Sequence, residues 1–531
     1  MKNKKTCKLN LNIAYLIPVI IGFVLTLVGI FGKELFDVLE PLAIPFKLFG
    51  VLIMSVTWLV SAIKSDEKPA LKSIGILTLT AIVLTWLIPH GQFAQQQFMD
   101  QSYQRFGLSD VAIVLYYALY FNLDKIIFLL QVSALYYMLS QTKAYQKLIA
   151  NIAKGLKGIE TYITILFATL FILLTSFVSH TLIVFLFVPF ALSILSKLKI
   201  DKLTTFAVTF GAILVGLVGV PFGSEGLRWF GYYSSIDGAE GLKYRLILQA
   251  IVLVGYLVFL FVRQHLATKK KIKAVAMVDP YEVKDNRAKV STIPLIVIFS
   301  LFTVLILLGY IDWYSNFNIT VFKDFHTWLT ELSIAEHPIF AYILGTSATE
   351  FGSWDIITGI VVMFIFSFVV ALANKVKIKE ILKSYEEGFK IMIKPVLYFT
   401  AVSFVFVVLY STPFLNTFLD WAYGLTEGLN PAISSLSAMI TSAFHPDLGY
   451  TGYLVGGYIT SAFSENIGIV HTIFISAYGF MQIFVPTSAL LILGLELTET
   501  SYKDWIKYIF IFLIALFVVL QAFLVLITYL V

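Results

Sequence analysis

The sequence predicts an all-α polytopic membrane protein with about 11 transmembrane helices plus two opposed re-entrant hairpins in an inverted repeat. Composition is the first observation behind this prediction. Of 531 residues, 59% are hydrophobic and only 13% are charged, and the mean hydropathy is +0.87. A soluble protein cannot bury so large an apolar fraction. The other two observations are the spacing of lysine-rich loops and a repeated pattern of polar residues inside apolar runs.

The apolar runs predict eleven spanning segments. In chain order these are 11–31, 43–63, 73–90, 111–141, 203–221, 242–262, 293–311, 354–373, 394–411, 467–490 and 505–530. The basic amino terminus MKNKKTCK precedes the first run, which is long enough to span and lacks a small-residue cleavage site. It therefore predicts a first transmembrane helix rather than a removed signal peptide. The fourth run is long, and its spanning helix is expected to begin at Asp124.

Lysine-rich loops alternate with sparsely basic ones along the chain. By the positive-inside rule, this alternation predicts a multi-pass protein of the cell membrane with a cytoplasmic amino terminus and an external carboxyl terminus. It also requires that 161–197 enter and leave on the cytoplasmic side, because Lys157 and Lys197 flank it. By the same alternation of cytoplasmic and external loops, 430–463 enters and leaves the membrane on the external side. Each region is then either a re-entrant hairpin or a pair of short spans of opposite orientation.

The two halves of the chain repeat the same pattern, a hydroxyl-rich stretch that ends in histidine and a proline later in the sequence. TSFVSH ends at His180 and TSAFH ends at His445, and each histidine lies 41 residues before a proline, Pro221 or Pro486. Equal spacing in opposite membrane orientation indicates an inverted-topology repeat. The predicted organisation is a tail and first helix at 1–42, a first repeat at 43–262 with hairpin 161–197 and broken helix 203–221, a cytoplasmic charged linker at 263–292, and a second repeat at 293–531 with hairpin 430–463 and broken helix 467–490.

Proline inside a span removes a backbone donor, and nearby glycine, serine and threonine favour a true break over a plain kink. A broken helix offers N–H groups to an anion and carbonyl groups to a cation, and hydroxyls complete the shell. The candidate substrate-binding residues are Ser176, Ser179, His180, Thr181, Gly219, Pro221, Gly223, Ser224, Thr441, Ser442, His445, Asp447, Gln482, Pro486, Thr487 and Ser488. The alternative is that these hydroxyls bond to their own helices, as Ser and Thr routinely do in spans.

Proton coupling is the role we expect for His180, His445 and Asp447, because a neutral imidazole can take up a proton near neutral pH. The alternative is that HPDLGYTG is simply a polar turn. The coupling ion, H⁺ or Na⁺, stays open. The single cysteine, Cys7, excludes a cysteine-built metal site. Neither HExxH nor a phosphate loop nor a nucleophile elbow occurs, so no metal, no cofactor and no enzyme activity are expected.

Four longer stretches have a recognisable pattern. The first half contains LDKIIFLLQVSALYYMLSQTKAYQKLI and, after the hairpin, VTFGAILVGLVGVPFGSEG. The second half contains EFGSWDIITGIVVMFIFSFVVALANKVKIKEILKSYEEGFKIMIKP and VPTSALLILGLELTETSYKDWIKYI, which closes on a Pro-Thr-Ser break and a helix start at Tyr502 and Trp505. Over roughly residues 110 to 530, the chain resembles YfcC-type carriers of the anaerobic C4-dicarboxylate carrier family within the ion transporter superfamily.

This resemblance implies an eleven-span fold with two opposed hairpins, elevator-like transport and a homodimer. The second tip, FHPDLGYTG, differs from the Ser/Gly-rich tips of the family, and both tips lack the Ser-Asn-Thr signature of sodium sites. The expected function is therefore secondary active transport of a small organic anion, C4-dicarboxylate or amino acid, either ion-coupled or by exchange. The expected partners are the lipid bilayer and a small-molecule substrate, and not nucleic acid, because the net charge of +6 comes mostly from lysines in short loops.

Two other functions are weighed against this one. A sodium/proton antiporter of the same superfamily would favour an intramembrane carboxylate pair, and the sequence shows none near the hairpins. A multispan membrane transferase would need acidic or histidine residues in a sizeable loop at one face. The external loops 91–109 and 312–337 are the candidates for such a site, and neither holds a convincing acid pair.

Overall fold

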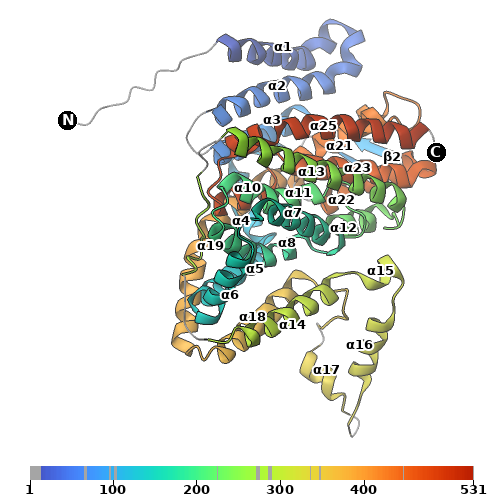
Figure 1. The fold of residues 1–531 in the computed structure, drawn as a ribbon. Helices are drawn as coiled ribbons and strands as arrows, with labels where there is room; N and C mark the ends of the chain where they lie inside the picture. Colours follow the sequence, from blue (N-terminus) through green and yellow to red (C-terminus); the bar gives the residue numbers. More distant parts are fainter. Residues whose placement is uncertain are drawn as a thin grey trace. The chain divides into compact units, whose positions relative to one another are not determined.

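The computed structural model describes residues 13–64, 69–94, 97–100, 105–223, 225–270, 275–284, 290–334, 337–345, 348–445 and 448–529. Within these ranges the structure is almost entirely helical, which confirms the predicted all-α class (Figure 1). The one sheet in them is a two-stranded antiparallel hairpin of β1 (Gly91–Ala94) and β2 (Gln97–Asp100).

The chain divides into two compact units, Met1–Leu115 with Phe404–Leu425, and Tyr116–Ser403 with Thr426–Val531. The first unit contains α1 (Ile13–Leu35), η1 (Asp37–Leu42), α2 (Ala43–Lys64), α3 (Pro69–Leu87), the β-hairpin, η2 (Leu108–Asp110) and α20 (Leu415–Tyr423). In it α2 packs on both α1 and α3, and Asn416 and Thr417 of α20 donate to the carbonyls before β1 and at its start. The first three helices thus pack chiefly on each other, and the predicted repeat boundaries stay a prediction.

The second unit carries both hairpin regions. Its first half contains α5 (Leu123–Gln141), α6 (Lys143–Gly155), α7 (Glu160–Phe177), α8 (Thr181–Val184), η3 (Phe185–Phe187), α9 (Val188–Lys197), α10 (Lys202–Phe206), η4 (Ala207–Gly211), α11 (Ala212–Gly216), α12 (Glu225–Ser234) and α13 (Leu242–Lys270). The unit boundaries fall inside two further helices, α4 (Val111–Tyr120) and α19 (Ile378–Ser411).

The second half of this unit begins after the linker. It contains α14 (Ile293–Tyr310), α15 (Trp313–Phe317), α16 (Val321–Glu331), α17 (Ile339–Leu344), α18 (Ile356–Ala373), α21 (Pro431–Phe444), α22 (Leu448–Ala462), η5 (Ser464–Asn466), α23 (Ile467–Gln482), α24 (Ala489–Leu497) and α25 (Tyr502–Tyr529). The chain is thus a multi-pass helical membrane protein, as its composition predicts.

Ten helices of the described ranges are long and apolar enough to cross a membrane, against eleven spans predicted. The difference has two sources. The predicted spans 203–221 and 467–490 are not continuous helices, because the helix stops at Gly216 in the first and at Gln482 in the second. Conversely, α7 in the first hairpin is itself long enough to span, with 18 residues, or about 27 Å. The first arm therefore fits a spanning helix, whereas α21 has 14 residues and is shorter than a span.

The two hairpin regions pack in the same way in both halves of the second unit. In the first half α7 packs on α11 and α13, and in the second half α21 packs on α23 and α25. The helix that follows the first break, α12, packs along α22 of the opposite hairpin (Figure 1). Matching elements thus make matching contacts, and each half also contacts the other.

Candidate functional site

The first hairpin turns between α7 and α8. His180 precedes α8 with extended backbone and is 2% exposed. The Ser179 N–H donates to the Tyr310 carbonyl at 2.7 Å, and the His180 and Tyr310 rings meet edge-on with centroids 6.0 Å apart. The first tip is therefore fixed against the carboxyl-terminal end of α14.

The first helix break follows α11 and ends at Gly223. Gly219 has φ of +69°, a conformation that favours glycine, and Pro221 has no backbone N–H to offer the helix. The Gly223 N–H donates to the Ser176 carbonyl at 2.7 Å. A Cβ atom at Gly223 would lie 2.6 Å from the Val178 carbonyl oxygen, so no larger residue fits. The break is thus tied directly to the last turn of α7.

Arg245 of α13 lies behind this break and is fully buried. Its guanidinium donates to the Pro221 carbonyl at 3.2 Å and also to the carbonyls of Gly238 and Glu240. Nη1 lies 3.2 Å from Nδ1 of His471, which is also buried. Arg245 forms no ion pair with a carboxylate of the described residues, and its charge is balanced there by carbonyl dipoles.

The second helix break lies between α23 and α24 and contains Pro486. Its free carbonyls are satisfied from the start of α25. The indole Nε1 of Trp505 donates to the Ile483 carbonyl at 2.9 Å, and the Tyr502 hydroxyl donates to the Phe484 carbonyl. The Tyr-x-x-Trp helix start noted in the sequence therefore has a physical role, because it supplies donors to backbone that has left helical geometry.

The second hairpin turns after α21, at His445. This side chain is fully buried, and its ring centroid lies 5.2 Å from that of Tyr450. The hydroxyl of Thr487 in the second break donates to the Ala443 carbonyl at 2.6 Å. Each tip is thus bonded to the break of its own repeat.

The two repeats meet at these same positions. Gly479 of α23 lies so close to Leu217 that a Cβ atom there would collide with the Leu217 backbone. Arg228 of α12 is exposed, and its guanidinium lies 3.4 Å from Nε2 of His180. Since α12 also packs along α22, it connects the first tip with the second hairpin. The structure brings both tips and both breaks into one region.

Polar side chains of this region fall into two groups. Those with partners include Ser176, which donates to Ile172 and accepts from Gln249, and Thr441, which donates to Ser437. Among the described residues, the buried polar atoms of the region that have no hydrogen-bond partner include Oγ of Ser179, Ser442 and Ser488 and Nε2 of Gln482. Buried polar atoms are normally satisfied, so this group is available to water or to a ligand.

The remaining predicted site residues can be placed briefly. Thr181 begins α8 and is half-buried. Ser224 and Asp447 lie outside the described residues, so the proposed pairing of His445 with Asp447 has no geometry. In the ranges that the structure does describe, no group of three His, Cys, Asp or Glu residues could hold a metal ion.

Sequence reasoning missed both arginines. Arg245 stands inside the predicted span 242–262, and an ionisable residue within a span is a signal for a buried functional role. Arg228 carried no comparable signal, because it lies outside the predicted spans. Its position beside His180 follows only from the way α12 packs against the hairpin.

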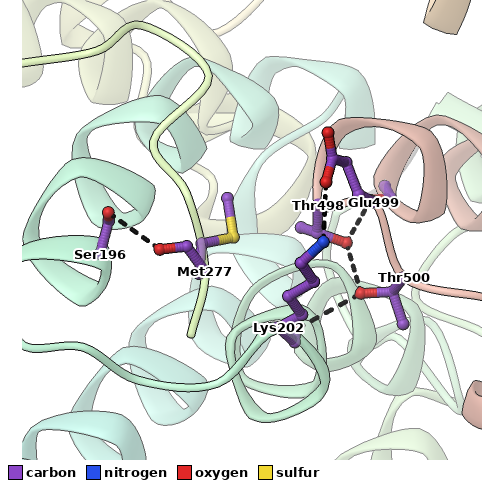
Figure 2. A network of polar contacts seen from close by, with 7 residues as sticks. Ser196, Lys202, Met277, Thr498, Glu499 and Thr500 are labelled. Atoms are coloured by element: carbon purple, nitrogen blue, oxygen red, sulfur yellow. Dashed lines mark hydrogen bonds and ion pairs between the residues drawn. The ribbon is translucent and has the colours of Figure 1, made fainter. Parts of the chain in front are cut away.

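A second polar network joins the halves near the carboxyl end of α9 and the start of α10 (Figure 2). Lys202 pairs with Glu499 at 2.7 Å, and the Thr500 hydroxyl donates to the Lys202 carbonyl. The hydrogen bond from Lys202 lowers the pKa of Glu499. The Ser196 hydroxyl donates to the Met277 carbonyl at 3.1 Å, which attaches the linker to α9. Since the Glu499 side chain is 73% exposed, this ion pair contributes little stability.

Comparison with known protein families gives no match, and comparison with curated proteins gives none either. Among solved structures, the chain is similar to the YdaH transporter of Alcanivorax borkumensis, whose crystal structure is described as having an unusual topology. The similarity has a TM-score of 0.38 and 12% sequence identity, and it covers 87% of this chain and 98% of the other. A TM-score of this size does not establish a shared fold, so the site is described by its own geometry.

Proposed function

We propose that this chain is a secondary active transporter for a small organic anion, such as a C4-dicarboxylate, or an amino acid. The observation that carries the proposal is the set of unpartnered polar atoms at the tips and breaks. Oγ of Ser179, Ser442 and Ser488 and Nε2 of Gln482 are buried and unsatisfied within the described residues. Each such group costs about 1–3 kcal/mol, a cost that a bound polar solute removes.

A carboxylate is the solute group that this region favours. Arg228 presents an exposed guanidinium at the first tip, and the fork of a guanidinium matches a carboxylate in geometry. Ser488 precedes α24, whose first N–H groups also favour an anion. An amino acid or dicarboxylate would use both features.

Elevator-type alternating access is the mechanism we propose. Both hairpins and both breaks belong to one compact unit, while α1, α2 and α3 belong to the other. The substrate-bearing elements can therefore move together as one body. Coupling to H⁺ or Na⁺, or exchange, completes the proposal, with His180 and His445 as the proton-carrying candidates.

Counterflow in proteoliposomes tests transport directly. Purified protein is reconstituted with unlabelled succinate, fumarate, malate, aspartate or glutamate inside, and uptake of the labelled compound is followed. We expect saturable counterflow for at least one compound, with half-saturation raised about tenfold or more by Arg228→Gln and less by Arg228→Lys. Lys243→Gln, an exposed charge removal on α13, is the control and should leave half-saturation unchanged. Absence of counterflow across the whole panel would remove this substrate class.

The coupling role has its own test. Uptake of the transported compound is measured between pH 5.5 and 8 for the wild type, His180→Ala and His445→Ala. A coupled histidine predicts that its variant loses the pH dependence. Variants that keep the wild-type pH profile would remove both histidines from the coupling mechanism.

A further inference from the structure

A second cavity, separate from the tips and breaks, lies in the same unit. Its volume is about 760 Å³, and it opens to the outside of the protein. It is lined by the last turn of α5, the start of α6, the start of α14, the end of α18 and the first turns of α19. None of the described residues that form the two tips or the two breaks lines it.

The ends of the candidate spans place this cavity at the depth of the headgroup layer. Four candidate spans end or begin at it, namely Leu123–Gln141 at its end, Ile293–Tyr310 at its start, Ile356–Ala373 at its end and Ile378–Ser411 at its start. Helices that cross the hydrocarbon core place such ends together at one polar boundary. The lysine distribution predicts that this boundary is the cytoplasmic one.

The lining charge is positive. Lys143, Lys375 and Lys383 line the cavity, and none of them pairs with a carboxylate of the described chain. Among the described residues, the one acidic residue of the lining is Glu380, which accepts a hydrogen bond from the Lys377 backbone N–H at the start of α19. Its carboxylate is therefore already used in capping that helix. Three ammonium groups around a half-open cavity provide a favourable site for a phosphate group.

Lys375 also has an unusual backbone. Its φ is +55°, at the left-handed position that follows α18, where glycine or asparagine is the usual residue. Its N–H donates to the Leu372 carbonyl, and the next N–H donates to the Ala371 carbonyl, as in a helix-ending turn. A lysine here costs conformational energy that glycine would avoid.

Apolar surface continues from the cavity. Met138, Leu295 and Val376 line it between the polar groups. Leu372 and Ile293, next in sequence to lining residues, are 77% and 68% exposed and are available to acyl chains. A lining of cationic and apolar groups at headgroup depth matches a phospholipid better than a free anion.

We infer that this cavity binds the headgroup of an anionic phospholipid, with its phosphate held by Lys143, Lys375 and Lys383. The acyl chains of this lipid lie along the apolar surface beside α14 and α18. The bound lipid fills the cavity and contacts the ends of α5, α14, α18 and α19 that line it. This site is independent of the proposed substrate, because it shares none of the described residues of the tips or the breaks.

Lipid binding is measured by native mass spectrometry and by thermal unfolding of the full-length protein in detergent. The probes are phosphatidylglycerol, phosphatidylcholine and inorganic phosphate. We expect phosphatidylglycerol to bind and to raise the melting temperature. Each lysine near an anionic membrane contributes about fivefold in affinity, so the triple variant Lys143→Gln/Lys375→Gln/Lys383→Gln should bind on the order of a hundredfold more weakly.

A matched control removes the same charge outside the cavity. Lys154→Gln/Lys157→Gln/Lys379→Gln changes three exposed lysines of the same predicted membrane face, and it should bind phosphatidylglycerol as the wild type does. Lys375→Gly separates binding from folding, because it relieves the left-handed backbone. It should melt no lower than the wild type, yet bind about fivefold more weakly.

Three results would overturn the inference. The triple variant could bind phosphatidylglycerol as well as its control does, which would remove the lysines from binding. Phosphatidylcholine could bind equally well, which would exclude charge selection. Inorganic phosphate alone at millimolar concentration could give the full thermal shift and displace the lipid, which would identify a free-anion site instead.

Discussion

The guanidinium of Arg245 donates to the carbonyl oxygen of Pro221 at 3.2 Å, and the Arg245 side chain is fully buried. Pro221 interrupts its helix, so the carbonyls around it lose the N–H partners that an unbroken helix would provide. Arg245 replaces those partners from the following span. In the second repeat, Trp505 and Tyr502 do the same for the carbonyls of Ile483 and Phe484. Each break is thus stabilised by donors from the next long helix of its repeat, α13 for the first break and α25 for the second.

Arg245→Gln should lower stability, because the buried carbonyl of Pro221 and the carbonyls of Gly238 and Glu240 lose a donor. We expect a cost of about 1–3 kcal/mol, seen as a melting temperature several degrees lower in detergent. Lys243→Gln removes an exposed charge from the same helix and should melt as the wild type does. Equal melting temperatures for the two variants would show that the Pro221 carbonyl does not depend on Arg245.

Trp505→Phe should be destabilising by about 1–3 kcal/mol, because the Ile483 carbonyl loses its donor while the aromatic packing against Phe206 is largely kept. Tyr508→Phe is the matched control on α25. Its hydroxyl has no partner in the described ranges, so its removal should be neutral. The prediction fails if the Tyr508 variant melts lower than the Trp505 variant.

The buried hydroxyls should separate into two classes. Ser179→Ala, Ser442→Ala and Ser488→Ala should each raise the half-saturation of transport about fivefold, the loss of one hydrogen bond, without lowering the melting temperature. Ser176→Ala and Thr487→Val should lower the melting temperature instead, because their hydroxyls bond across elements. Proteoliposome uptake and thermal unfolding measured on the same samples distinguish these classes. The assignment would be contradicted if the first three variants lowered the melting temperature and the other two changed only the half-saturation of transport.

Asp279 of the linker should give the folded protein a pH dependence. Burial raises the pKa of this carboxyl, against the hydrogen bond from the Tyr281 N–H, which lowers the pKa. A raised folded-state pKa means that the folded protein binds more protons than the unfolded chain, so stability falls as pH rises through the window above the unfolded value. Asp279→Asn keeps an acceptor for the Tyr281 N–H and cannot ionise.

The melting temperature of Asp279→Asn relative to the wild type should therefore increase as pH rises from about 4, and then level off above the raised pKa. Thermal unfolding of both proteins across pH 4 to 8 measures this difference. A constant difference, or one that shrinks with rising pH, would show that Asp279 is not held in a desolvated position.

Much of the fold follows from the sequence because hydropathy and proline act locally. The apolar runs set the spans, and the equal spacing of each tip histidine to its proline indicated both helix breaks. The length of α7 was harder to predict. The apolar run ends in the hydroxyl residues Thr175 and Ser176, yet both bond back to carbonyls four residues earlier and continue the helix to Phe177.

The site was only partly predictable, for a different reason. Hydroxyls near a break are visible in the sequence, but their partners are not. Ser176 and Ser179 are three residues apart. The Ser176 hydroxyl bonds to the Ile172 carbonyl and to Gln249 on α13, whereas the Ser179 hydroxyl has no partner in the described ranges. Arg228 reaches His180 through the packing of α12, which no local pattern encodes.

Protection of a cysteine at the second break tests the central claim most directly. Cys7 is the only cysteine in the sequence, so Cys7→Ser/Ser488→Cys carries a single thiol at the proposed site. Its rate of modification by a water-soluble thiol reagent is measured in proteoliposomes with and without each compound of the counterflow panel. The control is Cys7→Ser/Ser353→Cys, at an exposed loop position. The account predicts that the transported compound slows modification at position 488 about tenfold or more and leaves position 353 unchanged; equal rates at position 488 with and without a saturating transported compound would contradict it.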